Sequence, residues 1–160
     1  MKNVKRFLAS VTCAMLLGGC GLTSSPADAL TFKAPYGWQA SPGIMGFMQF
    51  WKSPSNSDEV LMLFRSPKQI DPNSVITSAK LKDTRIERKQ AIKICGNQPA
   101  IYFVGAGTSS SESNAAKQAE MQMVMTNANG AAYFAMYVYP IGVRPNDEAL
   151  AALRELCPKH

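Results

Sequence analysis

The sequence predicts one domain of the α+β class, in which a mainly antiparallel β-sheet is flanked by helices. Three observations favour this class: short apolar runs separated by Pro and Gly turns, an Asn-Gly pair between two alternating segments, and an apolar stripe at helical spacing near the C-terminus. Of the 160 residues, 141 run from Cys20 onward, which is enough for a single domain with its own core.

The N-terminal segment 1–19 has the composition of an export signal. Three basic residues precede an apolar run over 7–17, which is shorter than the about 20 residues that a membrane-spanning helix needs. The run ends on Leu17-Gly18-Gly19-Cys20, which resembles the lipobox of bacterial lipoproteins. In that family the cysteine is acylated and the chain is cut just before it.

The lipobox resemblance implies that Cys20 carries the lipid, with 20–30 as a tether and 31–160 as the domain. We expect an extracytoplasmic, lipid-anchored location, on the outer membrane facing the periplasm if the cell has two membranes, because Gly21 is not the aspartate associated with inner-membrane retention. Ala27-Asp28-Ala29 leaves a second interpretation open, since ordinary signal peptidase cuts such sites and would release a soluble protein.

The charge of the chain is ordinary once the signal is removed. The full sequence has 17 basic and 11 acidic residues, a net charge of +6, but three of the basic residues lie in the signal. The remaining 14 basic residues against 11 acidic ones give a net charge of +3. This balance argues against nucleic acid as a partner.

Two cysteines remain for the domain, Cys95 and Cys157. An even pair outside the cytoplasm is most simply a disulfide, which we predict here. Two separate buried thiols are the alternative. A catalytic cysteine is disfavoured because neither residue belongs to a C-x-x-C pair or has a histidine available as its base.

The middle of the chain predicts strands and one helix. A run without a polar face is typical of a strand covered on both sides, and Asp followed by Pro suits the start of a helix. Polar clusters with Pro, Gly or Asn separate these elements. In order, we expect strands over Thr31–Ala34, Met45–Lys52 and Val60–Phe64, a helix from Asp71-Pro72, one or two strands over Thr84–Cys95, a strand over Pro99–Gly105, and a surface loop over Thr108–Asn114.

Asn129-Gly130 is a strong hairpin signal, because both residues tolerate the positive φ of a type I′ turn. If these two residues form the turn, one face of the hairpin is uniformly apolar and the other is mixed. The apolar pairs predicted by this register are Met125 with Phe134, Met123 with Met136, and Met121 with Val138.

An amphipathic helix is predicted near the C-terminus. Asn146 or Asp147 caps it and Pro158 stops it. Its buried stripe is expected to contain Ala149, Leu150, Leu153, Leu156 and Cys157. A disulfide from this stripe to Cys95 would fasten the helix to the sheet.

Phe32-Lys33-Ala34-Pro35-Tyr36-Gly37-Trp38 resembles the F-x-x-P-x-G-W opening of PsbP/Mog1-like domains. The strand-rich middle and the C-terminal helix are similar as well. The resemblance implies an antiparallel sheet between helical layers, an α/β/α sandwich. That family has diverse binding and assembly roles, and none of its functional residues can be matched to this sequence.

The sequence predicts neither an enzyme nor a cofactor, and a Ser-Lys arrangement is the catalytic alternative that stays open, because serines and lysines are plentiful. His160, the last residue, is the only histidine, which removes Ser-His and Cys-His nucleophiles and most His-based metal sites. The acidic pairs Asp58-Glu59 and Asp147-Glu148 are explained by a turn and by a helix start. No glycine-rich phosphate loop is present in the sequence.

Met121, Met123 and Met125 are the sharpest candidates for a ligand site. On a strand their thioethers share one face, where they could bind Cu(I) as soft ligands. The favoured interpretation is a hydrophobic core, because the same alternation opposes other apolar residues and Met fills irregular cores well. The metal site is therefore kept as a speculative alternative.

A basic segment offers a second candidate surface. It could contact anionic lipid headgroups near the anchor, but such a segment is more often a solvated strand or loop face. Its residues are Lys80, Lys82, Arg85, Arg88, Lys89 and Lys93.

Taken together, these features predict a membrane-anchored lipoprotein that acts as a non-catalytic binding or assembly module, with an envelope protein as partner. The alternative is a small-ligand or Cu(I)-binding envelope protein. It would use the methionine face or an aromatic set made of Trp38, Trp51, Tyr133 and Tyr137.

Overall fold

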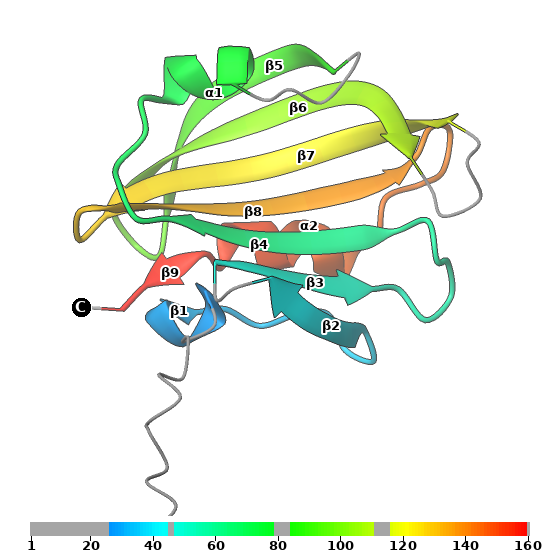
Figure 1. Cartoon of the computed structure of the whole chain (residues 1–160), viewed down its shortest axis with the longest axis horizontal. Helices are drawn as coiled ribbons and strands as arrows, with labels where there is room; N and C mark the ends of the chain where they lie inside the picture. The colour runs from blue at the N-terminus through cyan, green and yellow to red at the C-terminus, as the bar shows by residue number, and fades with distance from the viewer. Residues whose placement is uncertain (1–25, 45–46, 79–83, 111–115, 160) are drawn as a thin grey trace, which may run out of the picture.

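The computed structural model describes residues 26–44, 47–78, 84–110 and 116–159. These residues form a seven-stranded sheet of order β2-β3-β4-β8-β7-β6-β5, in which every pairing is antiparallel (Figure 1). The predicted lipidation site Cys20 and the signal lie outside the described residues. The strands are β2 (Gln39–Ile44), β3 (Met48–Lys52), β4 (Val60–Ser66), β5 (Arg85–Ile94), β6 (Gln98–Ser110), β7 (Ala116–Ala128) and β8 (Ala131–Pro140).

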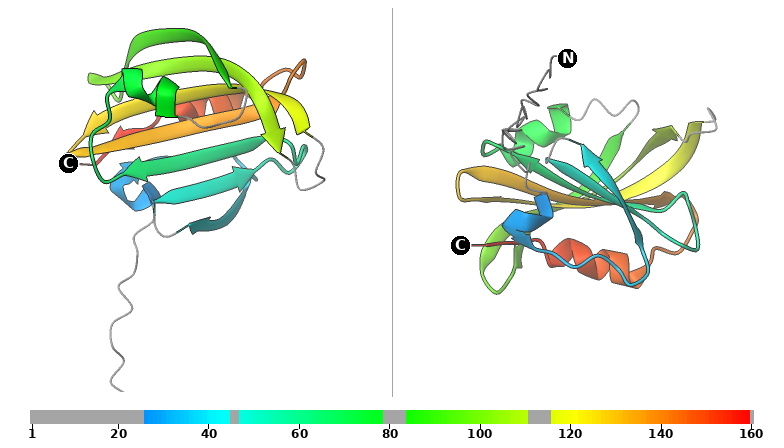
Figure 2. Two further views of the ribbon diagram at one scale, coloured as in Figure 1. Left: turned by 45° about the horizontal axis from the view of Figure 1, so that its top comes forward. Right: turned by 60° about the horizontal axis from the view of Figure 1, so that its bottom comes forward.

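Two short helices lie on opposite faces of this sheet, α1 (Pro72–Ser78) and α2 (Asp147–Arg154), as Figure 2 shows. Both begin as predicted: Asp71 Oδ1 accepts a hydrogen bond from the backbone N–H of Asn73, and Asn146 Oδ1 accepts one from Ala149. The helices have seven and eight residues and cover only part of the sheet. The predicted antiparallel sheet is confirmed, whereas full helical layers on both sides are not seen in the described parts of the chain.

The predicted hairpin is confirmed in its turn and in its register. Asn129 and Gly130 both have positive φ, 50° and 76°, and they connect β7 to β8. Because the side-chain period of a strand is two residues, the register decides which face each residue takes. The observed pairs include Met125 with Phe134, Met123 with Met136, and Met121 with Val138.

The larger hydrophobic core lies between the sheet and α2. Leu61, Tyr137 and Val124 from the sheet are fully buried here, together with Leu153 and Leu156. The aromatic set predicted as an alternative ligand surface packs in this core. Of the four, Trp51, Tyr133 and Tyr137 are buried, and Trp38 packs edge-on against Tyr137.

A second, two-stranded sheet joins the two ends of the domain. β1 (Leu30–Thr31) pairs antiparallel with β9 (Cys157–Pro158), and a 3₁₀ turn over Pro26–Ala29 precedes β1. The first strand is thus shorter than the predicted Thr31–Ala34. Pro26 and Leu30 are buried, so packed structure begins inside the segment predicted as a tether.

The predicted disulfide between Cys95 and Cys157 is present, with a Cα–Cα distance of 5.6 Å. Its place differs from the prediction, because α2 ends at Arg154 and Cys157 lies in β9. The bond therefore connects β9 to the β5–β6 turn. The prediction extended the helical stripe too far because Cys157 falls at helical spacing from Leu153, whereas its backbone pairs with Thr31.

The two longest strands were underestimated from the sequence. β6 continues to Ser110 and β7 starts at Ala116, so Thr108 and Ser109 extend a strand that was predicted to become a loop. The rest of that predicted loop lies outside the described residues. No helix in the described ranges is long and apolar enough to span a membrane.

Candidate functional site

The face of the sheet opposite α2 carries three rows of apolar side chains across neighbouring strands. We call it the methionine face. The pairings of β4 with β8 and of β8 with β7 place directly opposite residues next to one another on this face. Read from β4 through β8 to β7, the rows are Val60, Val138 and Met121; Met62, Met136 and Met123; and Phe64, Phe134 and Met125.

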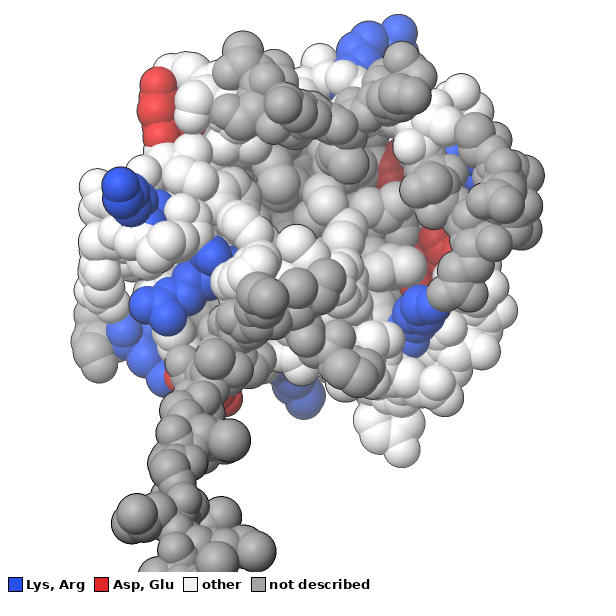
Figure 3. Space-filling view, viewed as in Figure 1, with Lys and Arg blue, Asp and Glu red and all other residues white. Residues whose placement is uncertain are grey.

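Figure 3 presents this face, with α1 in front of the sheet and α2 behind it. Where described atoms are visible in this view, uncharged side chains cover most of the surface, and the Lys, Arg, Asp and Glu side chains lie in separate patches. The apolar character of the face follows from the strand pairings, which place the three rows side by side.

A groove is hollowed into the methionine face and runs along the strands. Its inner part is a hollow of about 210 Å³ whose lining side chains are all apolar. Five of the nine lining residues are methionines, and Val75 of α1 closes one side. The lining residues are Met48, Met62, Phe64, Val75, Ile86, Met121, Met123, Phe134 and Met136.

The outer part of the groove is a hollow of about 260 Å³ that shares Met62, Met121 and Met136 with the inner part. It extends toward the start of β4 and the start of β7, and Asp58, Thr84 and Thr108 add polar groups there. Together the two parts reach the range of about 300–1,000 Å³ that is typical of small-molecule sites. The groove is thus apolar at one end and polar at the other.

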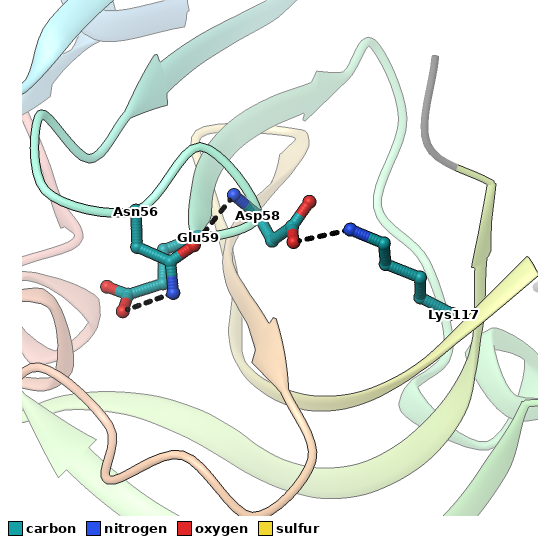
Figure 4. A network of polar contacts seen from close by, with 4 residues as sticks. All are labelled: Asn56, Asp58, Glu59 and Lys117. Carbon is teal, nitrogen blue, oxygen red and sulfur yellow. Dashed lines mark hydrogen bonds and ion pairs between the residues drawn. The ribbon is translucent and has the colours of Figure 1, made fainter. Parts of the chain in front are cut away.

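An ion pair lies at the polar end of the groove. Lys117 Nζ is 2.8 Å from Asp58 Oδ2, as Figure 4 shows. Asn56 holds the loop that carries Asp58, because its Oδ1 accepts from the backbone N–H of Asp58 at 3.1 Å and its Nδ2 donates to Glu59 Oε1 at 3.3 Å. The charged pair is partly exposed and is fixed by the turn before β4.

Gly105 of β6 makes room for one wall of the groove. A Cβ on this residue would lie 2.6 Å from the backbone oxygen of Arg85, a separation that Cβ atoms essentially never show. β5 has a register shift between Ile86 and Arg88 at this point, which brings it close over β6. Ile86 thereby reaches the inner hollow.

Of the three methionines predicted as a speculative metal set, Met123 and Met125 share one buried cluster, and Met121 and Met123 share the groove. Met121 and Met123 line the inner hollow, but Met125 is 1% exposed and packs in the closed cluster with Phe103 and Phe134. Local sequence signals do not place Met48 or Met62 on this face, because β4 joins β8 through a long-range pairing and β3 joins the sheet there through β4. Met136 was available from the hairpin register as the residue opposite Met123.

The opposite face of the sheet carries a buried polar network. Tyr137 Oη donates to Glu59 Oε2 at 3.1 Å and accepts from the backbone N–H of Asn146 at 3.0 Å. Burial, together with the nearby Glu59 carboxylate, raises the pKa of Tyr137 above the range in which tyrosine ordinarily ionises. Glu59 is 7% exposed, so the expectation that the Asp58-Glu59 pair is only a solvated turn is wrong for Glu59.

The network continues along the same face to Tyr139. Gln122 Nε2 donates to Tyr139 Oη at 2.9 Å, and Tyr102 Oη donates to Gln122 Oε1. Burial is the main cause that raises the pKa of Tyr139 to about 12, with a hydrogen bond to Glu120 adding to it. A hollow of about 310 Å³ beside α2 borders Tyr102 and Gln122, but these polar groups already bond to one another.

The predicted basic segment does not form one surface in its described part. Arg88 lies over the ring of Tyr102 at 5.7 Å, whereas Lys89 lies over the ring of Phe103 at 5.9 Å. Tyr102 and Phe103 are successive strand residues and point to opposite faces. The basic side chains are therefore divided between the two faces at the β5 edge, and Lys80 and Lys82 lie outside the described residues.

Within the described ranges, no group of three or more His, Cys, Asp or Glu side chains is arranged to hold a metal ion. Thioether sulfurs are outside that set of ligand types. The chemistry that the groove offers is therefore apolar contact, soft thioether donors and one ion pair at its mouth.

Comparisons with known proteins show the fold of this chain and do not show its function. No protein-family model matches this sequence, and no curated protein matches it. Among solved structures, PA94 from Pseudomonas aeruginosa, a protein of unknown function proposed as a regulator, is 13% identical with a TM-score of 0.54, over 79% of this chain and 90% of that one.

A Bacteroides thetaiotaomicron protein is 13% identical with a TM-score of 0.57, over 86% of this chain and 47% of that one. These two structures share the fold of this chain. Cyanobacterial PsbP from Synechocystis is 15% identical with a TM-score of 0.48, over 78% of this chain and 87% of that one. That score carries no argument about function, and the resemblance to PsbP/Mog1-like domains stays a prediction.

Proposed function

We propose that this chain is an envelope lipoprotein, anchored at an extracytoplasmic membrane surface through Cys20, and that it is a non-catalytic module that binds the acyl chain of a single-chain amphiphile. The groove on the methionine face is the observation that carries this proposal. It is lined by apolar side chains over its inner part and has an ion pair at its outer end.

The shape and lining of the groove fit an amphiphile better than a compact apolar molecule. The inner hollow offers only apolar side chains, so an acyl chain there loses contact with water at about 25 cal/mol per Å² of buried apolar area. A polar head at the other end would meet Asp58, Lys117 and the threonines Thr84 and Thr108.

The proposed anchor brings the groove close to a source of such chains. Only residues 21–25 separate Cys20 from Pro26, where packed structure begins. A fully extended chain spans at most about 3.6 Å per residue, so the domain stays within about 20 Å of its lipid. The disulfide is consistent with an oxidising compartment outside the cytoplasm.

Photo-crosslinking tests the binding proposal. The full chain is placed in phosphatidylethanolamine–phosphatidylglycerol vesicles with a diazirine-bearing palmitate, irradiated, digested and sequenced by mass spectrometry. We expect cross-links on β4, β7 and β8 residues of the methionine face, and we expect excess unlabelled palmitate to remove them.

Met136→Glu should abolish the cross-links, because it places a charge in the middle of the groove at a half-buried position. Val104→Glu is the matched control, since it adds the same charge at a half-buried strand position on the face that α2 covers. Labelling that spreads over both faces, or that survives Met136→Glu, would contradict acyl-chain binding in the groove.

The anchor has its own test. The intact mass of the protein purified from membranes should correspond to a chain that starts at Cys20 with acyl groups attached. A mass that corresponds to an unmodified chain starting at Leu30 would instead show cleavage after Ala29.

A second candidate function is an assembly module that binds an envelope protein. Tyr36 is 93% exposed and Ile141 is 53% exposed, unusually high values for such side chains. The backbone N–H of Tyr36 donates to Glu148 Oε2, which places Tyr36 beside the start of α2. Cross-linking in whole membranes should give one protein adduct that Tyr36→Ser removes, if this function holds.

A further inference from the structure

We propose that the groove also holds a soft monovalent cation, Cu(I), on the thioethers of Met62, Met123 and Met136. This inference uses the same groove as the proposed function but does not depend on amphiphile binding. It goes beyond the sequence prediction as well, because only Met123 belongs to the set expected from the sequence.

The three methionines occupy one row across three neighbouring strands. Met62 pairs directly with Met136, and Met136 pairs directly with Met123. Opposite residues of antiparallel strands have Cβ atoms about 4.5–5.5 Å apart, so each outer methionine is within reach of the middle one. All three side chains line the inner hollow.

Three sulfurs can converge on one ion from these positions. The outer two strands of the row are about 9–10 Å apart, and the three rotatable bonds of Met allow each outer thioether to lean over the middle strand. Met121, two residues before Met123 on the same face of β7, is available as a fourth donor.

Core filling alone does not account for this set. Met123 and Met125 both belong to the buried cluster with Phe103 and Phe134, but only Met123 of the two also lines the groove, and Met125 is 1% exposed. Met62 and Met136 are half-buried and border both parts of the groove. These two residues therefore lie in the part of the groove that an ion can reach from solvent.

The donor type selects the ion. Thioethers are soft, neutral ligands that favour Cu(I), whereas Zn²⁺, Mg²⁺ and Ca²⁺ prefer the nitrogen, thiolate or oxygen donors that the inner hollow does not present among its lining residues. The two carboxylates that border the groove, Asp58 and Glu120, line its outer hollow, and the inner hollow that holds the methionine row has none among its lining residues.

Competition with a chromophoric Cu(I) chelator tests the inference. The full chain in detergent micelles is titrated with Cu(I) under anaerobic, ascorbate-containing buffer. We expect wild-type protein to remove about one equivalent from the chelator. Zn²⁺ should not compete.

Met136→Leu and Met62→Leu should each weaken Cu(I) binding by about ten-fold or more, because loss of a ligand costs at least as much as loss of a partner in the outer shell of a metal site. Met125→Leu is the matched control and should bind as wild type does. Leu conserves the apolar volume, so all three variants should fold.

The inference is overturned if wild-type protein takes no Cu(I) from the chelator, or if Met136→Leu and Met125→Leu behave alike. The same Leu variants separate this result from the proposed function. Palmitate cross-linking should survive them, because Leu keeps the groove apolar, whereas Met136→Glu removes it. Loss of Cu(I) binding in the Leu variants, with palmitate cross-linking retained, therefore tests the metal site separately from amphiphile binding.

Discussion

The Tyr137 hydroxyl links three parts of the molecule. It donates to Glu59 in the turn before β4 and accepts from Asn146, the residue that caps α2. Glu59 is 78 residues from Tyr137 along the chain, whereas Asn146 is nine residues away. One phenol group thus fixes the start of β4 and the start of α2 relative to the core.

Tyr137→Phe should lower the free energy of unfolding by about 1–3 kcal/mol, because it leaves the buried Glu59 carboxylate and the Asn146 N–H without this partner. Urea denaturation followed by circular dichroism measures the change. Tyr133→Phe removes a hydroxyl from the same buried face of β8 and is the control. Equal losses in the two variants would show that the link has no specific role.

The raised pKa values of the buried tyrosines predict an alkaline limit of stability. Tyr139 has a pKa of about 12 in the folded protein, and an unfolded tyrosine ionises near pH 10. The folded protein keeps protons that the unfolded chain releases, so this contribution is complete below about pH 10 and is lost as pH rises from there to about 12.

Urea denaturation at pH 9, 10 and 11 should therefore show falling stability above pH 10, by up to about 1.4 kcal/mol per pH unit for each such tyrosine. Tyr139→Phe should make the fall shallower. Absorbance of tyrosinate at 295 nm should appear together with unfolding. An identical slope in wild type and Tyr139→Phe would contradict the assignment.

At the scale of elements, the close approach of β5 to β6 depends on Gly105. Gly105→Ala should destabilise the protein by about 1–3 kcal/mol, because the added Cβ meets the Arg85 backbone oxygen at 2.6 Å and backbone must move. Thermal unfolding measures the effect, and Ala106→Ser on the next residue is the control. If Gly105→Ala left the unfolding temperature unchanged, β5 could move away from β6 without loss of stability.

Local chemistry made some elements predictable from the sequence. The Asn129-Gly130 turn fixed the register of β7 with β8, and Asp71 and Asn146 marked the starts of the helices. Each of these signals acts over a few residues. The apolar stripe of the C-terminal helix was predicted too long. Helical spacing of apolar residues does not show where the helix ends and where backbone pairing with β1 begins.

The candidate site was only partly predictable, because local sequence signals do not specify which distant strands pair. Met121, Met123 and Met136 follow from the hairpin, but Met62 joins them through the pairing of β4 with β8, which are separated by more than sixty residues. Nothing local in the sequence specifies that register. Glu59 was misjudged because its partner, Tyr137, also lies on β8.

At the scale of the whole molecule, the disulfide closes a loop of 62 residues in sequence separation. Replacing both cysteines, Cys95→Ala with Cys157→Ala, should lower the free energy of unfolding by about 4 kcal/mol on the chain-entropy estimate. Urea denaturation with and without a reducing agent measures this. A loss below about 1 kcal/mol would mean that the bond scarcely restricts the unfolded chain.

The pairing of β1 with β9 has a mechanical consequence. If Cys20 carries the lipid, any pull between membrane and domain enters through Pro26 and reaches β1, whose strand partner in the described chain is β9. The two-residue pairing of β1 with β9 would alone separate under a small force. Cys157 connects β9 covalently to the turn between β5 and β6, at the far edge of the large sheet, so any load that crosses from β1 to β9 is carried into that sheet, while the attachment of β1 itself depends on its pairing and on the burial of Leu30.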